Sequence, residues 1–203
     1  MSIDRPFIVL VAGGTASGKS SIVSRFVQQT GAAQISHDRY YLDAKQPQGH
    51  DFDHPSSLQT ELLVSHVDGL RSGNTVSLPV YDFATHSRSQ ETESRAPSPL
   101  IVVEGILVMN DPQLVELADV CVFVEAPEGL RLARRIERDV RERGRTEASV
   151  RAQYAATVQP SHDRFVQPSK AQAGLILDGA APLKDSVESL IRSIPESVLI
   201  RLR

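Results

Sequence analysis

The sequence contains a single cysteine, Cys121. One cysteine can form neither an intramolecular disulfide nor a cysteine-based zinc site. No apolar stretch approaches the length that a membrane-spanning helix needs, and the first residues show no secretory pattern. We therefore expect a cytoplasmic protein with no membrane partner.

An excess of basic residues is also missing. The formal net charge is −3 at pH 7, with 22 lysines and arginines against 25 acidic residues. This balance argues against a nucleic-acid partner. The positive charge is unevenly spread, however, because eight of the 18 arginines lie between Arg131 and Arg151. Apolar residues make up 40% of the sequence, enough for one folded domain over residues 1–203.

Short apolar runs alternate with amphipathic segments along the chain. Continuous β-branched runs are typical of parallel strands that are buried on both faces, and 3.6-residue periodicity predicts helices between them. Strands are predicted at 7–12, 33–36, 100–103, 120–124 and 175–177. Helices are predicted from the glycine-rich turn to Gly31, from Ser56 to Ser72, from Pro127 to Gly144, over 147 to about 158, and over 183–194.

A different pattern occupies residues 76–95. Residues 76–81 alternate between apolar and polar, and Pro79 favours an edge strand. A second arm is expected over 90–95, which would complete a hairpin. The predicted fold class is therefore α/β, with a P-loop NTPase-type parallel sheet flanked by helices, a small β-hairpin lobe and a helical lid near 131–151.

Residues 13–20 read Gly-Gly-Thr-Ala-Ser-Gly-Lys-Ser, which matches the phosphate-loop pattern G-x-x-x-x-G-K-[ST]. The glycines let backbone N–H groups and a helix N-terminus face an anion. Lys19 is expected to reach the outer phosphates of a nucleotide, and the Ser20 hydroxyl is expected to bind Mg²⁺. The predicted nucleotide-binding residues are Gly13, Gly14, Thr15, Ala16, Ser17, Gly18, Lys19, Ser20 and Ser21.

The same loop occurs in transporters, GTPases, helicases and small-molecule kinases. The sequence has no N-K-x-D segment for reading guanine, and it is too short for a helicase, so metabolite kinases are favoured. Phosphoryl transfer needs charge neutralisation and a group that receives the acceptor's proton. Glu104, at the end of a buried strand, is expected to support magnesium, and Asp38 is a candidate base. In the alternative interpretation, Glu104 is an ordinary surface acid at a strand end and Asp38 only forms a turn.

The arginine cluster suits the same chemistry. Arg131, Arg135 and Arg138 share one helical stripe, and Arg143 and Arg145 follow at the helix end. Such a segment can close over a triphosphate and stabilise its charge. In the alternative, the helix is solvated and Glu137, Asp139 and Glu142 pair with arginines such as Arg134 and Arg141. An RNA-binding face is a third, less favoured interpretation.

Two aspartates lie in the segment His50-Asp-Phe-Asp-His54. The two histidines could suggest a metal site, but the segment has no helical signal and Pro55 follows at once. We prefer a role in acceptor binding, in which the Asp53 carboxylate accepts hydrogen bonds from two ribose hydroxyls.

The whole set of motifs resembles the uridine kinases (uridine–cytidine kinases), in the family's order and at similar spacing, from Phe7 to about Asp178. The matching blocks beyond the phosphate loop are Ile35-Ser-His-Asp-Arg-Tyr-Tyr41, Phe52-Asp-His-Pro55, Pro79-Val-Tyr-Asp-Phe83 with His86-Ser-Arg88, Val103-Glu-Gly-Ile-Leu107, Arg134-Arg-Ile-Glu-Arg-Asp139 with Arg143-Gly-Arg145, Gln153-Tyr154, and Phe165 with Pro168-Ser-Lys170.

The resemblance implies that ATP or GTP, with Mg²⁺, phosphorylates the 5′-hydroxyl of uridine and cytidine, giving UMP or CMP in pyrimidine salvage. It also implies a homo-oligomer, usually a tetramer. Asp38 matches the catalytic base, Ser20 and Glu104 match the magnesium partners, and Arg138 and Arg143 match lid arginines that act with Lys19 on the triphosphate. The segment 177–182 departs from the family's pattern in the region that lies near the donor base.

The resemblance further implies a set of nucleoside contacts, and physical reasoning adds two aromatic walls. Phe52 and Phe83 can supply the flat apolar surfaces that a pyrimidine needs. His86 can donate or accept a hydrogen bond, which suits both uracil and cytosine. The predicted nucleoside-binding residues are Tyr41, Phe52, Asp53, Tyr81, Phe83, His86, Arg135, Arg145 and Gln153, with acceptor-binding insertions at about 37–55 and 79–96.

Two alternatives remain open. One is a P-loop kinase for another small acceptor, of the pantothenate or phosphosugar type, because phosphoribulokinase-like enzymes share this layout. The other is a nucleotide-binding regulator without catalysis.

Overall fold

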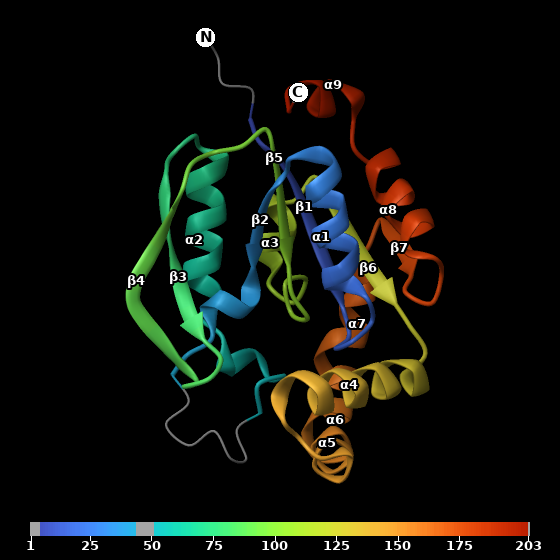
Figure 1. The fold of residues 1–203 in the computed structure, drawn as a ribbon. Coiled ribbons are helices and arrows are strands. Elements are labelled where there is room, and N and C mark those ends of the chain that lie inside the picture. The colour runs from blue at the N-terminus through green and yellow to red at the C-terminus, as the bar shows by residue number, and fades with distance from the viewer. Residues whose placement is uncertain (1–4, 44–50, 203) are drawn as a thin grey trace.

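Parallel strands form the centre of the structure, a computed structural model that describes residues 5–43 and 51–202 (Figure 1). The five strands of this sheet follow the order β2–β5–β1–β6–β7. β1 lies in the middle, where Val9 pairs with Val102 on one side and Val120 on the other. The bounds are β1 (Phe7–Gly13), β2 (Ala33–Ser36), β5 (Leu100–Glu104), β6 (Val120–Glu125) and β7 (Leu175–Asp178).

Helices cover both faces of this sheet, which explains why the central strands are apolar throughout. Val9 and Val11 belong to the core beneath α1 (Lys19–Thr30) and α8 (Leu183–Arg192), to which α9 (Glu196–Ile200) adds Val198. Ile8 and Leu10 belong to the core beneath α2 (Thr60–Arg71) and α3 (Pro112–Leu117).

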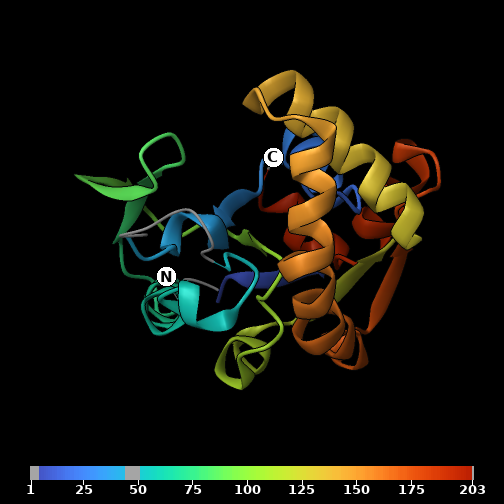
Figure 2. The same ribbon diagram turned by 90° about the horizontal axis from the view of Figure 1, so that it is seen from below.

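The segments that follow the carboxyl ends of the strands gather at one end of the sheet. The 3₁₀ turn η1 (His37–Tyr40) follows β2, and α4 (Glu128–Arg143) follows β6. Figures 1 and 2 show α4 and residues 147–172 on one side of this end. The hairpin of β3 (Val76–Asp82) and β4 (Ser87–Arg95) stands on the other side. Open parallel sheets bind their ligands at this end.

The predicted sheet and hairpin are confirmed, with two adjustments. The second hairpin arm begins at Ser87, earlier than expected. β7 is an edge strand in which Ile176 is 49% exposed, so only one face of the predicted core strand, with Leu175 and Leu177, packs on the core.

The predicted helix start at Ser56 is wrong, because α2 begins at Thr60. Pro55–Ser57 form a 3₁₀ turn, in which the His54 side chain accepts a hydrogen bond from the Ser56 amide. Leu58 is extended and forms an isolated β-bridge with Tyr41. This bridge holds Leu58 out of helical geometry and delays the helix by one turn.

The helix expected over 147 to about 158 continues to Gln172. α5 (Glu147–Gln153) is followed by a π turn (Tyr154–Val158), α6 (Gln159–Ser161), a second π turn (His162–Val166), α7 (Gln167–Ser169) and a 3₁₀ turn (Lys170–Gln172). Pro160 and Pro168 would each clash with the carbonyl four residues earlier in an α-helix. Those carbonyls belong to Ala156 and Arg164, which lie in the two wider π turns. The helix therefore continues past both prolines without the clash.

None of the helices in residues 5–43 and 51–202 is both long enough and apolar enough to cross a membrane.

The turn after β7 packs closely on the loop before α1, which gives a prediction about Gly179. A Cβ on Gly179 would lie 2.0 Å from the Ser17 carbonyl oxygen, whereas a Cβ on Gly129 in α4 would meet nothing within 4 Å. We expect Gly179→Ala to lower the free energy of unfolding by about 1–3 kcal/mol, because backbone must shift. Gly129→Ala should raise it by up to about 1 kcal/mol. Urea denaturation measures both, and equal stabilities would contradict the tight packing at Gly179.

Candidate functional site

The turn between β1 and α1 is shaped by glycines. Gly13 has φ 145° and Gly18 has φ 99°, both in the region that favours glycine. A Cβ on Gly13 would lie 2.5 Å from the Val124 carbonyl oxygen, so this glycine lets the chain pass beside β6. Among the described residues, no side chain caps α1 and no acidic residue occupies its first turn. The N–H groups at the start of α1 are therefore open to an anion.

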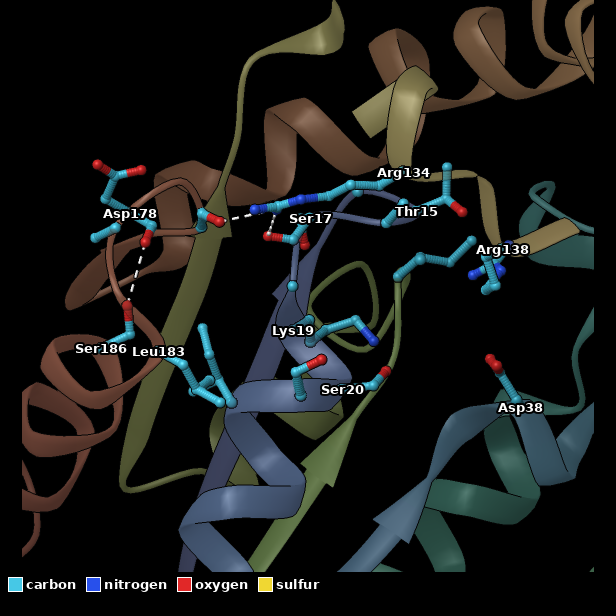
Figure 3. A pocket seen from close by; sticks show the side chains of 18 residues that line it. Thr15, Ser17, Lys19, Ser20, Asp38, Arg134, Arg138, Asp178, Leu183 and Ser186 are labelled. Atoms are coloured by element: carbon cyan, nitrogen blue, oxygen red, sulfur yellow. Dashed lines mark hydrogen bonds between the residues drawn. The ribbon is translucent and has the colours of Figure 1, made fainter. Parts of the chain in front are cut away.

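A pocket of about 560 Å³ opens over this loop (Figure 3). Figure 3 shows Asp38 and Arg138 on one side, Leu183 and Ser186 on the other, and Lys19 between them. The structure thus gathers all the predicted nucleotide-binding residues except Gly13, which lies behind the loop, around one pocket. The lining residues are Gly14, Thr15, Ala16, Ser17, Gly18, Lys19, Ser20, Ser21, Ile22, Asp38, Ile106, Arg134, Arg138, Asp178, Gly179, Ala181, Leu183 and Ser186.

Lys19, which lines this pocket, forms an ion pair with Glu104, and the two residues are only 8% and 5% exposed. The Ser20 hydroxyl lies 3.5 Å from the same Glu104 oxygen. Burial opposes ionisation of Glu104, but the Lys19 ammonium and the hydroxyls of Ser36 and Ser20 hold its pKa below the usual range. An ionised carboxylate next to a hydroxyl supplies the hard oxygen ligands that Mg²⁺ prefers, so these two residues fit a magnesium ion.

Asp38 faces the pocket from η1, directly after β2. Burial and the Glu104 charge raise the pKa of Asp38, whereas the Lys19, Arg143 and Arg138 charges oppose the rise. A carboxyl group with a raised pKa is better suited to receive a proton. The geometry therefore brings a potential base close to the phosphate loop.

His37, beside Asp38, is a buried residue of the site to which the sequence analysis assigned no role. Its Nε2 lies 3.2 Å from the Thr60 hydroxyl, and burial lowers the pKa of His37 to about 4, so the ring is neutral at pH 7. A Cβ on Gly105 would lie 2.5 Å from the His37 Cβ. A glycine directly after Glu104 was the available sequence signal for this close approach.

The aromatic residues predicted to bind a nucleoside form one cluster. The ring of Tyr41 lies 5.6 Å from that of Phe52 and 5.5 Å from that of Tyr81, measured between centroids. Phe52 lies 5.2 Å from His86, and Tyr81 lies 5.1 Å from Phe83. Phe83 is 56% exposed, so it forms the outer edge of the cluster and not an enclosed wall.

Arg135 connects the phosphate loop with the other predicted nucleoside contacts. It donates hydrogen bonds to the Thr15 hydroxyl at 2.9 Å and to Gln153 Oε1 at 3.2 Å. Arg145 donates to the same Gln153 oxygen at 2.7 Å. Burial raises the pKa of Asp53 to about 6, against the opposing charge of Arg135. The structure thus brings these four predicted contacts to one side of the loop.

The remaining arginines of α4 divide between burial and solvent. Arg131 is buried and donates to the Ala126 carbonyl. Arg134 donates to the Gly179 carbonyl at 2.8 Å, so the solvated interpretation of Arg134 is wrong. Arg141 is exposed and pairs with Glu137 and Glu142, as that interpretation predicted. Asp139, its third proposed acid, is fully buried instead.

Comparisons with known proteins identify the family and the fold. A model of the phosphoribulokinase/uridine kinase family matches residues 8–183. A protein described as uridine kinase from Chloroflexus aurantiacus is 42% identical over 197 residues, which cover 93% of this chain and 94% of that protein. One from Clostridium perfringens, also described as uridine kinase, is 36% identical over 200 residues, which cover 95% and 96%.

Solved structures share the fold at lower identity. D-glycerate 3-kinase from Cryptococcus neoformans aligns with a TM-score of 0.67 at 17% identity, covering 88% of each chain. Phosphoribulokinase from Rhodobacter spheroides aligns with a TM-score of 0.66 at 15% identity, covering 86% of this chain and 70% of that one.

The raised pKa of Asp53 predicts a pH-dependent stability. Its value of about 6 exceeds the value of about 3.9 for an unfolded aspartate. Between these values the folded state binds more protons than the unfolded state, so stability falls as pH rises. Asp53→Asn should therefore raise the free energy of unfolding at pH 7, by an amount of order 1 kcal/mol, and leave it nearly unchanged at pH 4. Urea denaturation at both pH values tests this, with Asp68→Asn, an exposed change on α2, as the control. The same pH response in both variants would contradict the raised pKa.

Proposed function

We propose that this chain, which belongs to the phosphoribulokinase/uridine kinase family, transfers the terminal phosphoryl group of ATP or GTP to the 5′-hydroxyl of uridine and cytidine. The observation that carries the proposal is the position of Asp38. It lines the pocket over the phosphate loop, and its charge, after burial, also contributes to the raised pKa of Tyr41 in the aromatic cluster. One carboxylate thus lies between a triphosphate site and a site suited to a nucleoside.

On the donor side, residues 13–21 hold the triphosphate and Lys19 contacts its outer phosphates. Arg138 and Arg143, from a lid over about 131–151, neutralise the charge that spreads over the transferred group. Ser20 and Glu104 would hold Mg²⁺, which supplies further charge neutralisation when it is bound.

The 5′-oxygen forms a bond to the γ-phosphorus as the bond from that phosphorus to the bridging oxygen of the β-phosphate breaks, and ADP or GDP leaves. Asp38 receives the proton that the 5′-hydroxyl loses. Its raised pKa suits this step, because a stronger base draws the proton more readily. The Lys19, Arg143 and Arg138 charges oppose this rise in the pKa of Asp38 and so favour the carboxylate form that a base needs.

On the acceptor side, Asp53 and Arg135 bind the ribose hydroxyls, and Tyr81 and His86 bind the polar edge of the base. His86 has φ 53°, which is uncommon for a residue other than glycine and is found preferentially at functional sites. The same ring can donate to or accept from either pyrimidine. The remaining contacts are Tyr41, Phe52, Phe83, Arg145 and Gln153.

The wider setting follows from the family resemblance. We place the reaction in pyrimidine salvage in the cytoplasm, without a nucleic-acid or membrane partner. Residues 1–203 form one nucleoside kinase domain, with acceptor-binding insertions at about 37–55 and 79–96, and the chains assemble as a homo-oligomer, a tetramer in most of the family. Residues 44–50 of the first insertion lie outside the described residues.

A product assay tests the substrates directly. Uridine and cytidine, each incubated with Mg²⁺ and either ATP or GTP, should give UMP and CMP. Pantothenate and a phosphosugar serve as alternative acceptors in the same assay. Turnover of either alternative without turnover of uridine or cytidine would contradict the proposal, as would nucleotide binding without any phosphoryl transfer.

The proposed base gives a sharper prediction. Asp38→Asn keeps the size of the side chain but cannot take a proton, so kcat should fall by about 10²–10⁴-fold. The affinity for Mg²⁺–nucleotide, measured by calorimetry, should remain close to that of the wild type. Asp68→Asn on α2 is the control and should keep the wild-type rate. Equal rates for Asp38→Asn and the wild type would remove Asp38 from the mechanism.

A further inference from the structure

Asp139 lies at the centre of the α4 arginines, and its side chain is 0% exposed. Its backbone carbonyl accepts hydrogen bonds from the N–H groups of Gly144 and Arg145, so the residue also fixes the end of the helix. Burial opposes ionisation, but hydrogen bonding to Arg138 and the nearby arginine charges keep the pKa of Asp139 below its usual range. The carboxylate is therefore ionised at neutral pH.

The two oxygens of this carboxylate contact different arginines. Oδ1 accepts from Arg138 Nε at 2.9 Å and lies 3.5 Å from an Arg143 nitrogen. Oδ2 accepts from Arg145 at 3.1 Å and lies 3.8 Å from Arg135 Nε. Under the proposed function, Oδ1 contacts the arginines that bind the triphosphate, and Oδ2 contacts the arginines that bind the nucleoside.

This division links the two sites energetically. A triphosphate that attracts Arg138 and Arg143 competes with Oδ1 for their charge. The carboxylate is then freer to attract Arg145 and Arg135, which hold Gln153 between them. Because binding linkage is reciprocal, a nucleoside that orders this side must favour the nucleotide to the same degree.

We propose that Asp139 is a positioning residue that couples nucleoside binding to nucleotide binding through its two oxygens. Asp139 itself touches neither substrate in this scheme and acts through the four arginines. The inference rests on the proposed function, because the arginine roles come from it.

The test measures a coupling ratio, defined as the Kd of a Mg²⁺-bound non-hydrolysable ATP analogue without uridine divided by its Kd with saturating uridine. Calorimetry should give a ratio of about five or more for the wild type, within the usual range for coupled sites. Asp139→Asn keeps the shape of the side chain but replaces a negative oxygen with a donor, so its ratio should approach one. A purely structural role would lower the melting temperature and leave the ratio unchanged.

Two further variants sharpen this test. Glu137→Gln removes the same charge from the same helix, but Glu137 is 73% exposed and pairs with Arg141, so its ratio should match that of the wild type. Arg143→Gln removes one Oδ1 partner from a largely exposed side chain and should lower the ratio without unfolding the protein. This second variant decides the matter if Asp139→Asn does not fold.

The outcomes separate the inference from the function on which it rests. A wild-type ratio that is retained in Asp139→Asn, or in Arg143→Gln where Asp139→Asn does not fold, overturns the coupling role while uridine phosphorylation stands. A wild type that binds uridine with a ratio of one also overturns it. A wild type that neither binds nor phosphorylates uridine or cytidine overturns the proposed function and, with it, this inference.

Discussion

Lys19 and Glu104 place opposite charges together beneath the phosphate loop, where water is largely excluded. Taking both charges out of water is costly unless their geometry is fixed. The sheet fixes it. Glu104 is opposite Val11 in the register of β5 against β1, and the next amide, of Gly105, donates to the Val11 carbonyl at 3.1 Å. Lys19 begins α1, so the turn after β1 must bring the helix back over the end of β5. The glycines at 13 and 18 allow that turn.

The order of strands then determines which groups surround this ion pair. Crossing the sheet from β2, each strand ends in one part of the site. Asp38 follows β2, Glu104 ends β5, and the phosphate loop follows β1. The arginines of α4 follow β6, and the turn at Gly179 follows β7. Groups far apart in the sequence meet because parallel strands all end at the same edge. The β3–β4 hairpin stands beside that edge and is not part of the sheet.

Much of this arrangement could be predicted from the sequence because it depends on local residue patterns. The continuous β-branched runs predicted the buried strands, since both faces of a parallel sheet are covered. The glycine loop predicted the turn before α1 and its place in the site. α3 was missed, although Asp111 and Pro112 at its start are ordinary helix-start signals, because its six residues carry little periodicity.

The wrong predictions depend on contacts that local patterns do not contain. The β-bridge between Leu58 and Tyr41 makes α2 begin later than predicted, and the residues around Ser56 give no sign of this contact. The helix predicted to end near Val158 continues, because the π turns before Pro160 and Pro168 remove the clash that proline causes in an α-helix. Solvation of Arg134 stayed open as an alternative because the Gly179 carbonyl that binds it lies 45 residues away in sequence.

The contacts of Asp139 with the arginines of α4 follow from residue spacing and not from amino-acid composition. Arg135 precedes it by four positions and Arg143 follows it by four, so all three share a helical face. Paired acids and bases at this spacing are usually a solvated surface, and only burial distinguishes the two cases. Here burial makes one carboxylate serve four guanidinium groups, which outnumber it. The cluster therefore remains positively charged at neutral pH, and under the proposed function an anionic triphosphate would supply the charge that Asp139 alone cannot.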